Sequence, residues 1–351
     1  MSTAVPTQTP SYTTQIGDCA RDRERVLGIW HDNLGLPERH AAKYDWFYLG
    51  SPYGMPLLTL LRHEPSGTWI GTCAAGPRRM LWQGREIRAG VLVDMAVAAQ
   101  HRTLGPALMM QFALIAAARQ RFELIYGFPN PKSLAVAKRL DYAVINALVR
   151  YVRVLRHRHY LQRKMPRWLA ALPGWLLDLP EVLRRVLSRV PQASWSDRAD
   201  ARMDAAWRDC SQGAGPVTVR DAAFLRWRFE TFRPVQTRYL VVAAQVESAP
   251  PLAWFTCQIE DGMLHVRDFW SAPGAGQLPR PALIALLRAA YRIGCHAVSI
   301  EYAGLPGALA TLHACGFRER GQRPVIVRWN ASPAPDPLPQ FPHLTAADED
   351  E

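Results

Sequence analysis

One stretch of the chain, residues 90–130, restricts the possible folds more than any other. It begins with Gly90–Val97, an apolar and β-branched run that is long enough for a buried strand and is interrupted only by Asp94. From Pro106 to Arg119 no residue after the proline breaks a helix, and proline suits a helix start because its missing N–H would have no partner there. A second apolar run precedes Asn130. The pattern predicts a strand, a glycine turn, a helix and a strand, with an asparagine at the last strand's exit.

The turn before this helix has the features of an anion site. A tight turn that opens a helix leaves several backbone N–H groups without partners, and the helix dipole adds partial positive charge there. Gly105 and Ala107 let a ligand approach the backbone, and Arg102 can add a full charge. An ordinary strand-to-helix connection would explain a lone glycine turn equally well.

The same stretch resembles the GNAT superfamily of acyl-CoA-dependent N-acetyltransferases. The signature of that family is Gln or Arg, two residues, Gly, one residue, then Gly or Ala, and Arg102, Gly105 and Ala107 fill these places. The resemblance implies a site for acetyl-CoA or another acyl-CoA, with backbone donors at the end of the central strand holding the developing oxyanion. The cofactor-binding residues that it implies are Met95, Val97, Arg102, Thr103, Leu104, Gly105, Pro106, Ala107, Asn130 and Ser133.

Two departures from the family pattern bear on function. Pro106 removes one N–H from the turn, which weakens a phosphate cradle that uses this group. Ala137 stands where many family members carry the tyrosine that protonates the leaving thiolate, so another group or water must do this in an enzyme. Asp141 and Tyr142 occupy the places of the family's Gly-Phe pair.

Asp94 is the candidate general base for deprotonating an amine. A carboxylate inside an apolar strand is costly unless it is hydrogen-bonded or faces a cleft. Strand alternation places it on the face opposite to Val91 and Val93, where several family members carry catalytic groups, so a structural role is an alternative. Tyr48 and Tyr53 are the candidate residues for binding the acceptor, with a core position as the alternative.

Composition limits the class of protein and of partner. The chain has 351 residues, 49% of them hydrophobic, which predicts a globular protein long enough for two domains. Its net charge of +12 favours an anionic partner, which a nucleotide cofactor, a nucleic acid or a phospholipid surface could provide. The six cysteines form no C-x-x-C pair, so we expect reduced thiols, no zinc or other metal site, and a cytoplasmic protein. Neither a secretion signal nor a run long enough to span a membrane is present in the sequence.

A basic segment follows the first half of the chain. Residues 150–190 contain ten Lys or Arg against two acidic residues, interleaved with Trp and Leu and broken by three prolines. This composition is typical of an amphipathic element at an anionic membrane surface, which predicts a peripheral location at the inner face of the membrane. Packing between two domains, with solvated arginines, is the alternative. The segment resembles no nucleic-acid-binding motif, which disfavours a nucleic-acid partner.

The second half repeats the first in outline, which predicts an internal duplication. Its turn, residues 271–280, does not fit the phosphate signature, so we expect this half to bind no cofactor. The predicted fold class is α/β (α+β), with two GNAT-like mixed-sheet domains joined by a basic helical segment. The predicted parts are a disordered N-terminus (1–15), a GNAT domain with the acyl-CoA site (16–155), a basic amphipathic linker (156–198), a degenerate GNAT-like domain (199–331) and a disordered acidic tail (332–351).

The resemblance implies an N-acyltransferase that moves an acyl group from acyl-CoA to an amine. The basic segment suggests a membrane-linked or polysaccharide amino sugar as the acceptor. Two alternatives stay open: a Fem-type aminoacyl-tRNA-dependent transferase, and a non-catalytic GNAT-like adaptor at a membrane surface.

Overall fold

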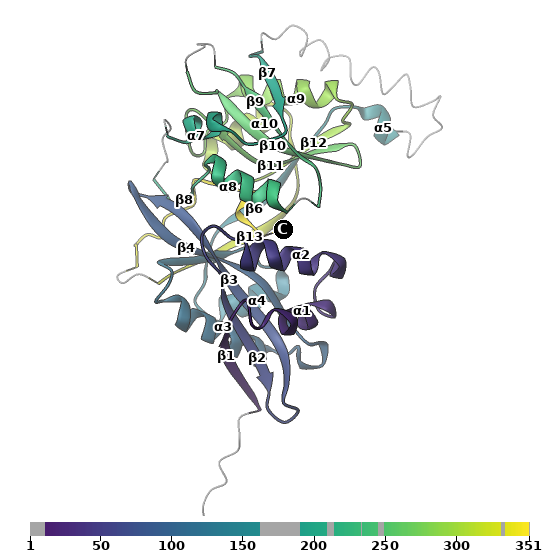
Figure 1. Cartoon of the computed structure of the whole chain (residues 1–351). Helices are drawn as coiled ribbons and strands as arrows, with labels where there is room; N and C mark the ends of the chain where they lie inside the picture. The colour runs from purple at the N-terminus through teal and green to yellow at the C-terminus, as the bar shows by residue number, and fades with distance from the viewer. Residues whose placement is uncertain are drawn as a thin grey trace, which may run out of the picture.

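The strands form one mixed sheet that runs along the molecule (Figure 1). The computed structural model describes residues 11–161, 190–208, 214–232, 234–244, 249–330 and 334–350. Within these residues the 14-stranded sheet has the main order β1-β2-β3-β4-β5-β13-β6-β12-β11-β10-β9-β7, while β8 pairs with β3 and β14 pairs with β12. The predicted mixed α/β class is confirmed. Most of the predicted amphipathic segment, residues 162–189, lies outside the described residues.

The first half of the chain forms a meander followed by a parallel strand pair. Gln83 and Gly84 both have positive φ, 52° and 77°, as the tight turn between β3 and β4 requires. The next strand pair, β4 and β5, is parallel and is connected through α3, because parallel neighbours need a crossover. The strands are β1 (Tyr12–Gly17), β2 (Leu57–His63), β3 (Thr68–Trp82), β4 (Arg85–Val97), β5 (Leu124–Gly127) and β6 (Ala143–Val154). The helices are α1 (Arg23–His31), η1 (Pro37–Arg39), α2 (His40–Tyr44), η2 (Asp45–Leu49), η3 (Ala99–His101), α3 (Leu104–Ala118), α4 (Pro131–Lys138) and α5 (His157–Leu161).

The second half has a similar order of elements, with β11 and β12 as its parallel pair. Its strands are β7 (Ala193–Ser196), β8 (Val217–Thr218), β9 (Thr237–Val242), β10 (Ala253–Glu260), β11 (Met263–Ser271), β12 (Ala297–Gly304), β13 (Arg318–Trp329) and β14 (His343–Thr345). Its helices are α7 (Ala201–Arg208), α8 (Ala222–Arg226), η4 (Trp227–Thr231), α9 (Arg280–Arg292), α10 (Pro306–Ala314) and η5 (Ala346–Asp348). Both halves contain a short α-helix that continues into a π-helix, α2 with η2 and α8 with η4.

Two strands are exchanged between the halves. β13, from the second half, pairs with β5, and Ile326 lies opposite Gly127. β6, from the first half, pairs with β13 on one side and with β12 on the other. β6 and β13 therefore lie in the middle of the sheet. The two halves share one sheet, and the division into domains at residues 155 and 199 stays a prediction.

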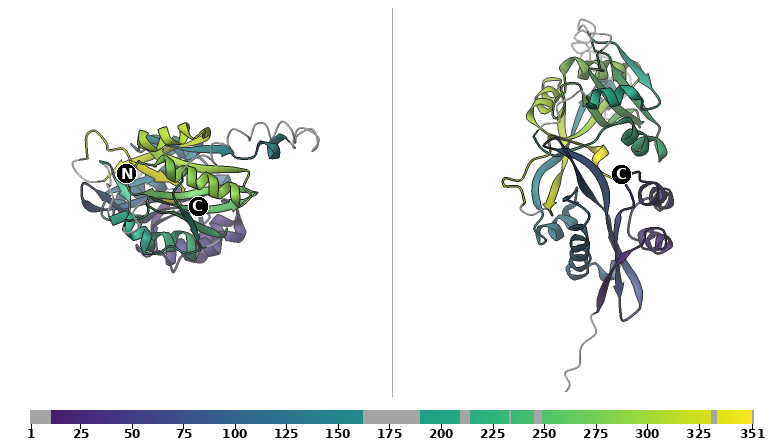
Figure 2. Two further views of the ribbon diagram at one scale, coloured as in Figure 1. Left: turned by 90° about the horizontal axis from the view of Figure 1, so that it is seen from above. Right: turned by 60° about the vertical axis from the view of Figure 1, so that its left-hand side comes forward.

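Helices cover both faces of the sheet in the first half (Figure 2). On one face, Val26 and Trp30 of α1 pack in the same buried cluster as Val93 of β4. On the other face, Met110 of α3 and Val136 of α4 pack in one buried cluster with residues of β4 and β5, such as Val97 and Ile125. β4 and β5 therefore lie between two helical layers.

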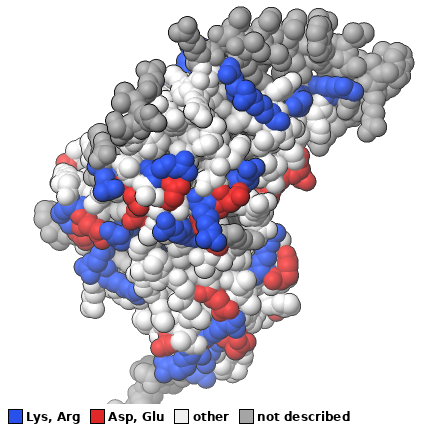
Figure 3. Space-filling model, turned by 45° about the horizontal axis from the view of Figure 1, so that its top comes forward, with Lys and Arg blue, Asp and Glu red and all other residues white. Residues whose placement is uncertain are grey.

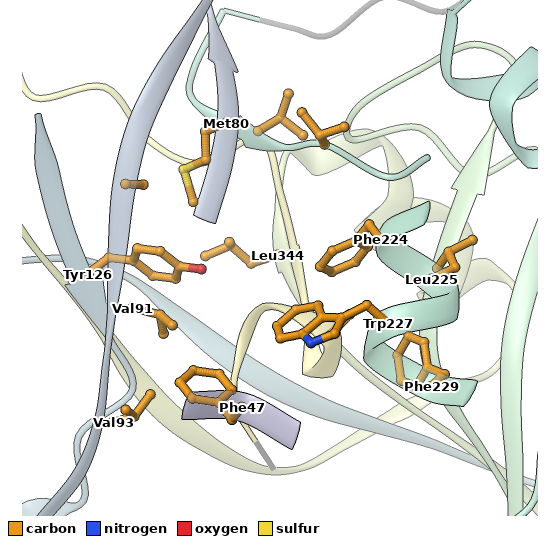
Figure 4. Packing of buried hydrophobic residues seen from close by; sticks show 14 of the residues in the cluster. Phe47, Met80, Val91, Val93, Tyr126, Phe224, Leu225, Trp227, Phe229 and Leu344 are labelled. Atoms are coloured by element: carbon orange, nitrogen blue, oxygen red, sulfur yellow. The ribbon is translucent and has the colours of Figure 1, made fainter. Parts of the chain in front are cut away.

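The two halves meet through aromatic side chains. The Trp46 ring stacks on the Trp227 ring at a centroid distance of 5.3 Å, and its indole nitrogen donates a hydrogen bond of 2.8 Å to the Trp227 carbonyl. In Figure 4, Leu344 lies between Tyr126 of the first half and Phe224 of the second. The core at this junction thus depends on a residue near the end of the chain.

Both ends of the described chain correct the prediction of disorder. Residues 12–15 belong to β1, whose backbone pairs with β2 along its whole length, so these residues are ordered although their side chains are partly exposed. Residues 341–349 are buried and include β14 and η5, so the prediction of a disordered acidic tail over 332–351 is wrong for this stretch. The reason is that buried basic side chains from earlier in the chain, such as Arg220, neutralise the acidic residues of this segment.

Candidate functional site

A cavity of about 230 Å³ lies where β4 and β5 separate. The two strands pair at only three positions, the last of which is Val91 opposite Tyr126. Beyond this position the cavity is lined by residues 92–95 of β4 and residues 127–130 at the end of β5. Gln111 of α3 completes part of the wall. The end of the central strand and the exit of the next strand, which the sequence singled out, therefore meet at one cavity.

A β-bulge places Asp94 in this cavity. Thr72 lies opposite Ala96 and Ala74 lies opposite Val93, so Asp94 and Met95 together face a single residue of β3. Asp94 has a φ of 51°, in the left-handed region that aspartate tolerates better than most residues. The bulge interrupts the alternation of the strand, so the prediction that Asp94 lies on the face opposite to Val93 is wrong.

Asp94 belongs to a buried cluster of charged and polar groups. Lys43 of α2 donates hydrogen bonds of 2.7 Å to Asp94 and 2.6 Å to Asp350, and the Tyr48 hydroxyl donates to the other oxygen of Asp94 at 3.0 Å. The Asp94 side chain is 4% exposed, while Lys43 and Asp350 are 18% and 14% exposed. A lysine of the first half and a carboxylate from the end of the chain therefore surround the candidate base.

The environment shifts the proton affinity of these groups in different directions. Burial raises the pKa of Asp94 to about 6, although the Lys43 ammonium acts in the opposite direction. Burial also acts to raise the pKa of Asp350, but Lys43 and Arg228 outweigh it and lower that pKa below the usual range. Burial raises the pKa of the Tyr48 hydroxyl, so this hydroxyl stays protonated and donates to Asp94. Asp94 is thus the member of the cluster that exchanges a proton near neutral pH.

The predicted phosphate turn forms the start of α3. Thr103 is the N-cap and Leu104, Gly105 and Pro106 form the first turn, whose backbone N–H groups have no partner within a helix. A Cβ built on Gly105 meets no atom within 4 Å, so the space over this residue is open. Arg102 is committed elsewhere, because its guanidinium donates to the Val97 carbonyl at 2.8 Å and to Asn33 at 2.7 Å.

Asn130 and Ser133, two of the cofactor-binding residues that the resemblance implies, line the cavity from the start of α4. Asn130 is the N-cap of this helix, and its side-chain oxygen accepts from the backbone N–H groups of Lys132 and Ser133. Its amide oxygen is therefore used by the helix. Ala137 also lines the cavity, with Tyr142 beside it.

Tyr53 does not join this cavity. It lines a second one, of about 360 Å³, together with Arg79, Arg88 and Arg121, and its ring packs edge-on against Trp227. Tyr53 and Asp94 therefore line different cavities, and acceptor binding by Tyr53 stays a prediction. Tyr48 contacts Asp94 directly but is itself 1% exposed.

Comparison with solved structures reveals the same architecture elsewhere. A protein of Enterococcus faecalis V583, described as a probable N-acyltransferase, is similar with a TM-score of 0.63 at 8% identity, over 91% of this chain and 72% of that chain. A GCN5-related N-acetyltransferase from Anabaena variabilis ATCC 29413 gives 0.61 at 11% identity, over 91% of this chain and 73% of that one. One from Kribbella flavida gives 0.57 at 10% identity, over 92% and 73%. The chain has the GNAT fold.

The sequence itself matches no protein-family model and no curated protein. At such low identities the likeness establishes the GNAT fold and leaves the reaction to be argued from the site. Within the described residues, no group of three or more His, Cys, Asp or Glu side chains is placed to hold a metal ion. In the same part of the chain, no helix combines the length and apolar character needed to span a bilayer.

Sequence reasoning missed two groups of this candidate site. Lys43 lies in a short helix with no motif around it, and its role depends on two carboxylates that are 51 and 307 residues away. Asp350 was assigned to the acidic tail on composition. One feature of the sequence bears on both Lys43 and Asp350, namely the excess of positive charge before the acidic end of the chain. This excess offers the acidic residues many possible basic partners and does not identify which of them pair.

Proposed function

We propose that the protein is an acyl-CoA-dependent N-acyltransferase that transfers an acyl group to an amine. The observation that carries this proposal is the cavity between the separated strands β4 and β5, with Asp94 brought into its wall by a bulge. A narrow cavity of this kind suits a thioester arm, and a carboxylate that exchanges its proton near pH 6 suits an amine.

The residues present fit the diphosphate of acyl-CoA. Three features favour an anion at the start of α3: the unpaired N–H groups of its first turn, the helix dipole, and the open space over Gly105. Pro106 withholds one donor, and Arg102 supports the site by holding the end of β4. When bound, acyl-CoA supplies an activated acyl group on a thioester.

Asp94 has the role of proton acceptor in this proposal. Tyr48 and Lys43 hold its carboxylate in place, and burial keeps its pKa close to the working pH, where a base is most effective. The backbone N–H groups of the bulge at residues 94–95 provide the donors for the developing oxyanion, because a bulge frees groups from the strand ladder.

The test is acetyl-CoA binding, measured by calorimetry, to the wild type and to Gly105→Glu. A carboxylate in the first turn favours the helix itself through the dipole, so folding is preserved while the diphosphate is repelled. At an effective dielectric constant of about 20, two charges a few ångströms apart repel by roughly 4 kcal/mol, so we expect binding to weaken by more than about 100-fold. The matched control is Gly28→Glu, which adds the same charge to α1, also in open space.

The outcomes separate the functions that the sequence left open. Binding by the wild type and by Gly28→Glu, but not by Gly105→Glu, supports an acyl-CoA site. Equal binding by all three proteins places the diphosphate elsewhere. Absence of binding by the wild type refutes the proposal for this cofactor and favours a tRNA-dependent transferase or a non-catalytic adaptor.

The proposal can be made more specific for both substrates. We propose acetyl-CoA as the donor and a membrane-linked or polysaccharide amino sugar as the acceptor. The membrane link, and with it a peripheral location at the inner face of the membrane, rest on the basic composition of residues 156–190. On the face shown in Figure 3, Lys and Arg are interspersed with Asp and Glu, so the described residues of that face add no unbroken basic surface.

A further inference from the structure

The second cavity, of about 360 Å³, lies near the end of the β4–β5 pair that is remote from Asp94. Its walls include Ala89, the first residue of β4 that pairs with β5, and Phe122, which precedes β5 in the chain. Further along β4, Val91 packs with Phe47 in the buried core (Figure 4). This apolar packing separates the second cavity from the first, so the two cavities form distinct sites.

Arginine side chains determine the charge of the second cavity. It is lined by four of them, Arg78, Arg79, Arg88 and Arg121, and by one carboxylate, Glu86. Arg79 holds this carboxylate through hydrogen bonds of 3.1 Å from Nε and 2.8 Å from Nη2. The nearby carboxylate of Asp221 also pairs with Arg79, at 3.7 Å. Both negative charges are therefore used by one arginine, and three further cations remain at the cavity.

Arg78 is one of these three cations and is almost fully buried, with no carboxylate partner among the described residues. Its guanidinium carbon lies 5.2 Å from the ring centroid of Phe47 and 5.0 Å from that of Trp227. The guanidinium donates to the backbone carbonyls of Pro77 and Glu349, at 3.1 and 3.3 Å. A buried charge without a counterion destabilises the folded protein, so an anion in the cavity would offset part of this cost.

Arg88 and Arg121 are the two cations that a ligand can contact. Arg88 is exposed, and its guanidinium forms no ion pair with a described residue. Glu123 accepts from the Arg88 backbone N–H, but its carboxylate pairs with Arg85 at 2.6 Å. Arg121 is partly buried, donates to the Met55 carbonyl, and likewise has no carboxylate partner in the described part of the chain. Burial lowers the pKa of Arg121, and an anionic ligand beside it would act in the opposite direction.

The rest of the cavity wall is apolar or aromatic and includes Pro52, Tyr53, Pro77 and Phe122. Guanidinium groups bind phosphate and carboxylate oxygens through paired hydrogen bonds, while aromatic walls accommodate an apolar body. We propose that the second cavity binds a small organic anion whose phosphate or carboxylate group contacts Arg88 and Arg121. This site does not depend on acyl-CoA as the cofactor of the first cavity.

The first test measures binding of phenyl phosphate and of benzoate to the wild type by calorimetry, with benzyl alcohol as the neutral control. Because hydrogen bonds between charged groups are the strong ones, at least one of the two anions should bind about 10-fold more tightly than the alcohol. The anion that binds more tightly identifies phosphate or carboxylate as the recognised group. Equal binding of the anions and the alcohol, or absence of binding of both anions, overturns the inference.

The second test repeats the titration with Arg88→Gln and with the matched control Arg119→Gln. Both arginines are exposed, so both variants should fold, but Arg119 lies at the end of α3 and does not line the cavity. Arg88→Gln should weaken binding of the preferred anion by about 10-fold, since one charged contact is lost. Arg119→Gln should leave binding within a factor of about two, because solvent and salt screen a distant exposed charge. An equal loss in both variants, or no loss in Arg88→Gln, overturns the inference.

The third test determines which cavity holds the anion. Gly105→Glu places a carboxylate at the start of α3, outside the second cavity, so this variant should bind the preferred anion as tightly as the wild type does. Weaker binding would place the anion at the predicted diphosphate turn and would overturn the inference. None of these titrations uses acetyl-CoA, so a failure of the proposed function leaves their results unaffected.

Discussion

Replacing Arg220 by methionine should destabilise the junction between the two halves. The Arg220 guanidinium lies 3.0 Å from Asp268 of β11 and 2.5 Å from Asp348 of η5, and the three side chains are 0% exposed. Thr345 completes the cluster, because its hydroxyl donates to Asp268 and its backbone N–H donates to Asp348. Methionine fills similar space but leaves two carboxylates without a cation in an apolar core.

The size of the effect follows from the burial of the cluster. Breaking a fully buried pair by removing one partner costs about 3–5 kcal/mol, because the remaining charge is uncompensated. An unfolding entropy of about 2.1 cal/mol/K per residue gives roughly 0.7 kcal/mol per kelvin for 351 residues. The Tm should therefore fall by about 4–7 °C.

The loss should depend on pH in a defined direction. Burial already raises the pKa of Asp268 in the folded state, and Arg220 acts in the opposite direction, so the loss of Arg220 raises this pKa further above that of the unfolded chain. A raised carboxyl pKa contributes stability below the unfolded pKa, and this contribution is lost as pH rises through the folded pKa. The difference between variant and wild type should therefore be larger at pH 8 than at pH 5.5.

Urea unfolding at these two pH values measures the difference. The matched control is Arg238→Met, which breaks an exposed pair with Asp197 and should change the free energy of unfolding by less than about 1 kcal/mol. The reasoning is refuted if Arg220→Met costs no more than the control, or if its cost is the same at pH 5.5 and pH 8.

Two further predictions concern the base. Asp94→Asn should lower kcat by about 10²- to 10⁴-fold and remove the rise of kcat/KM with pH through about 6, because the carboxylate is active only when deprotonated; a pH profile of the variant that keeps this rise would exclude Asp94 as the base. Asp350→Asn should shift the same rise to lower pH, because the Asp350 charge raises the pKa of Asp94 and its removal leaves Lys43 to act on Asp94 alone. A shift to higher pH in kcat/KM profiles would contradict this account of the cluster.

Local patterns in the sequence predicted local structure well. The apolar run at residues 90–97 and the helix after Gly105 have their cause within a few residues, so apolar patterning and helix-start signals identify them. Asn130 likewise lies at a strand exit in the sequence and in the structure.

The structural features that the sequence did not predict depend on residues far away in the chain. The bulge at Asp94 is a property of the pairing with β3, and no residue type within residues 90–97 marks it. The place of β13 is decided by which strand edge is left open after the first half, which a local pattern does not contain. The acidic end of the chain is ordered because Asp348 and Asp350 form ion pairs with Arg220 and Lys43. Composition alone predicts that such an acidic segment is solvated.

The exchange of β6 and β13 also determines when the site can form during synthesis. About 190 residues separate the end of β5 from the start of its neighbour β13, so at roughly 5–20 residues per second the ribosome needs on the order of 10–40 s to provide that neighbour. Until then the edges of β5 and β6 are unpaired, and such edges attract other chains. Slow elongation before β13 therefore prolongs the exposure of these edges, and a chain that is released before β13 has been made lacks the strand that joins β5 to β6.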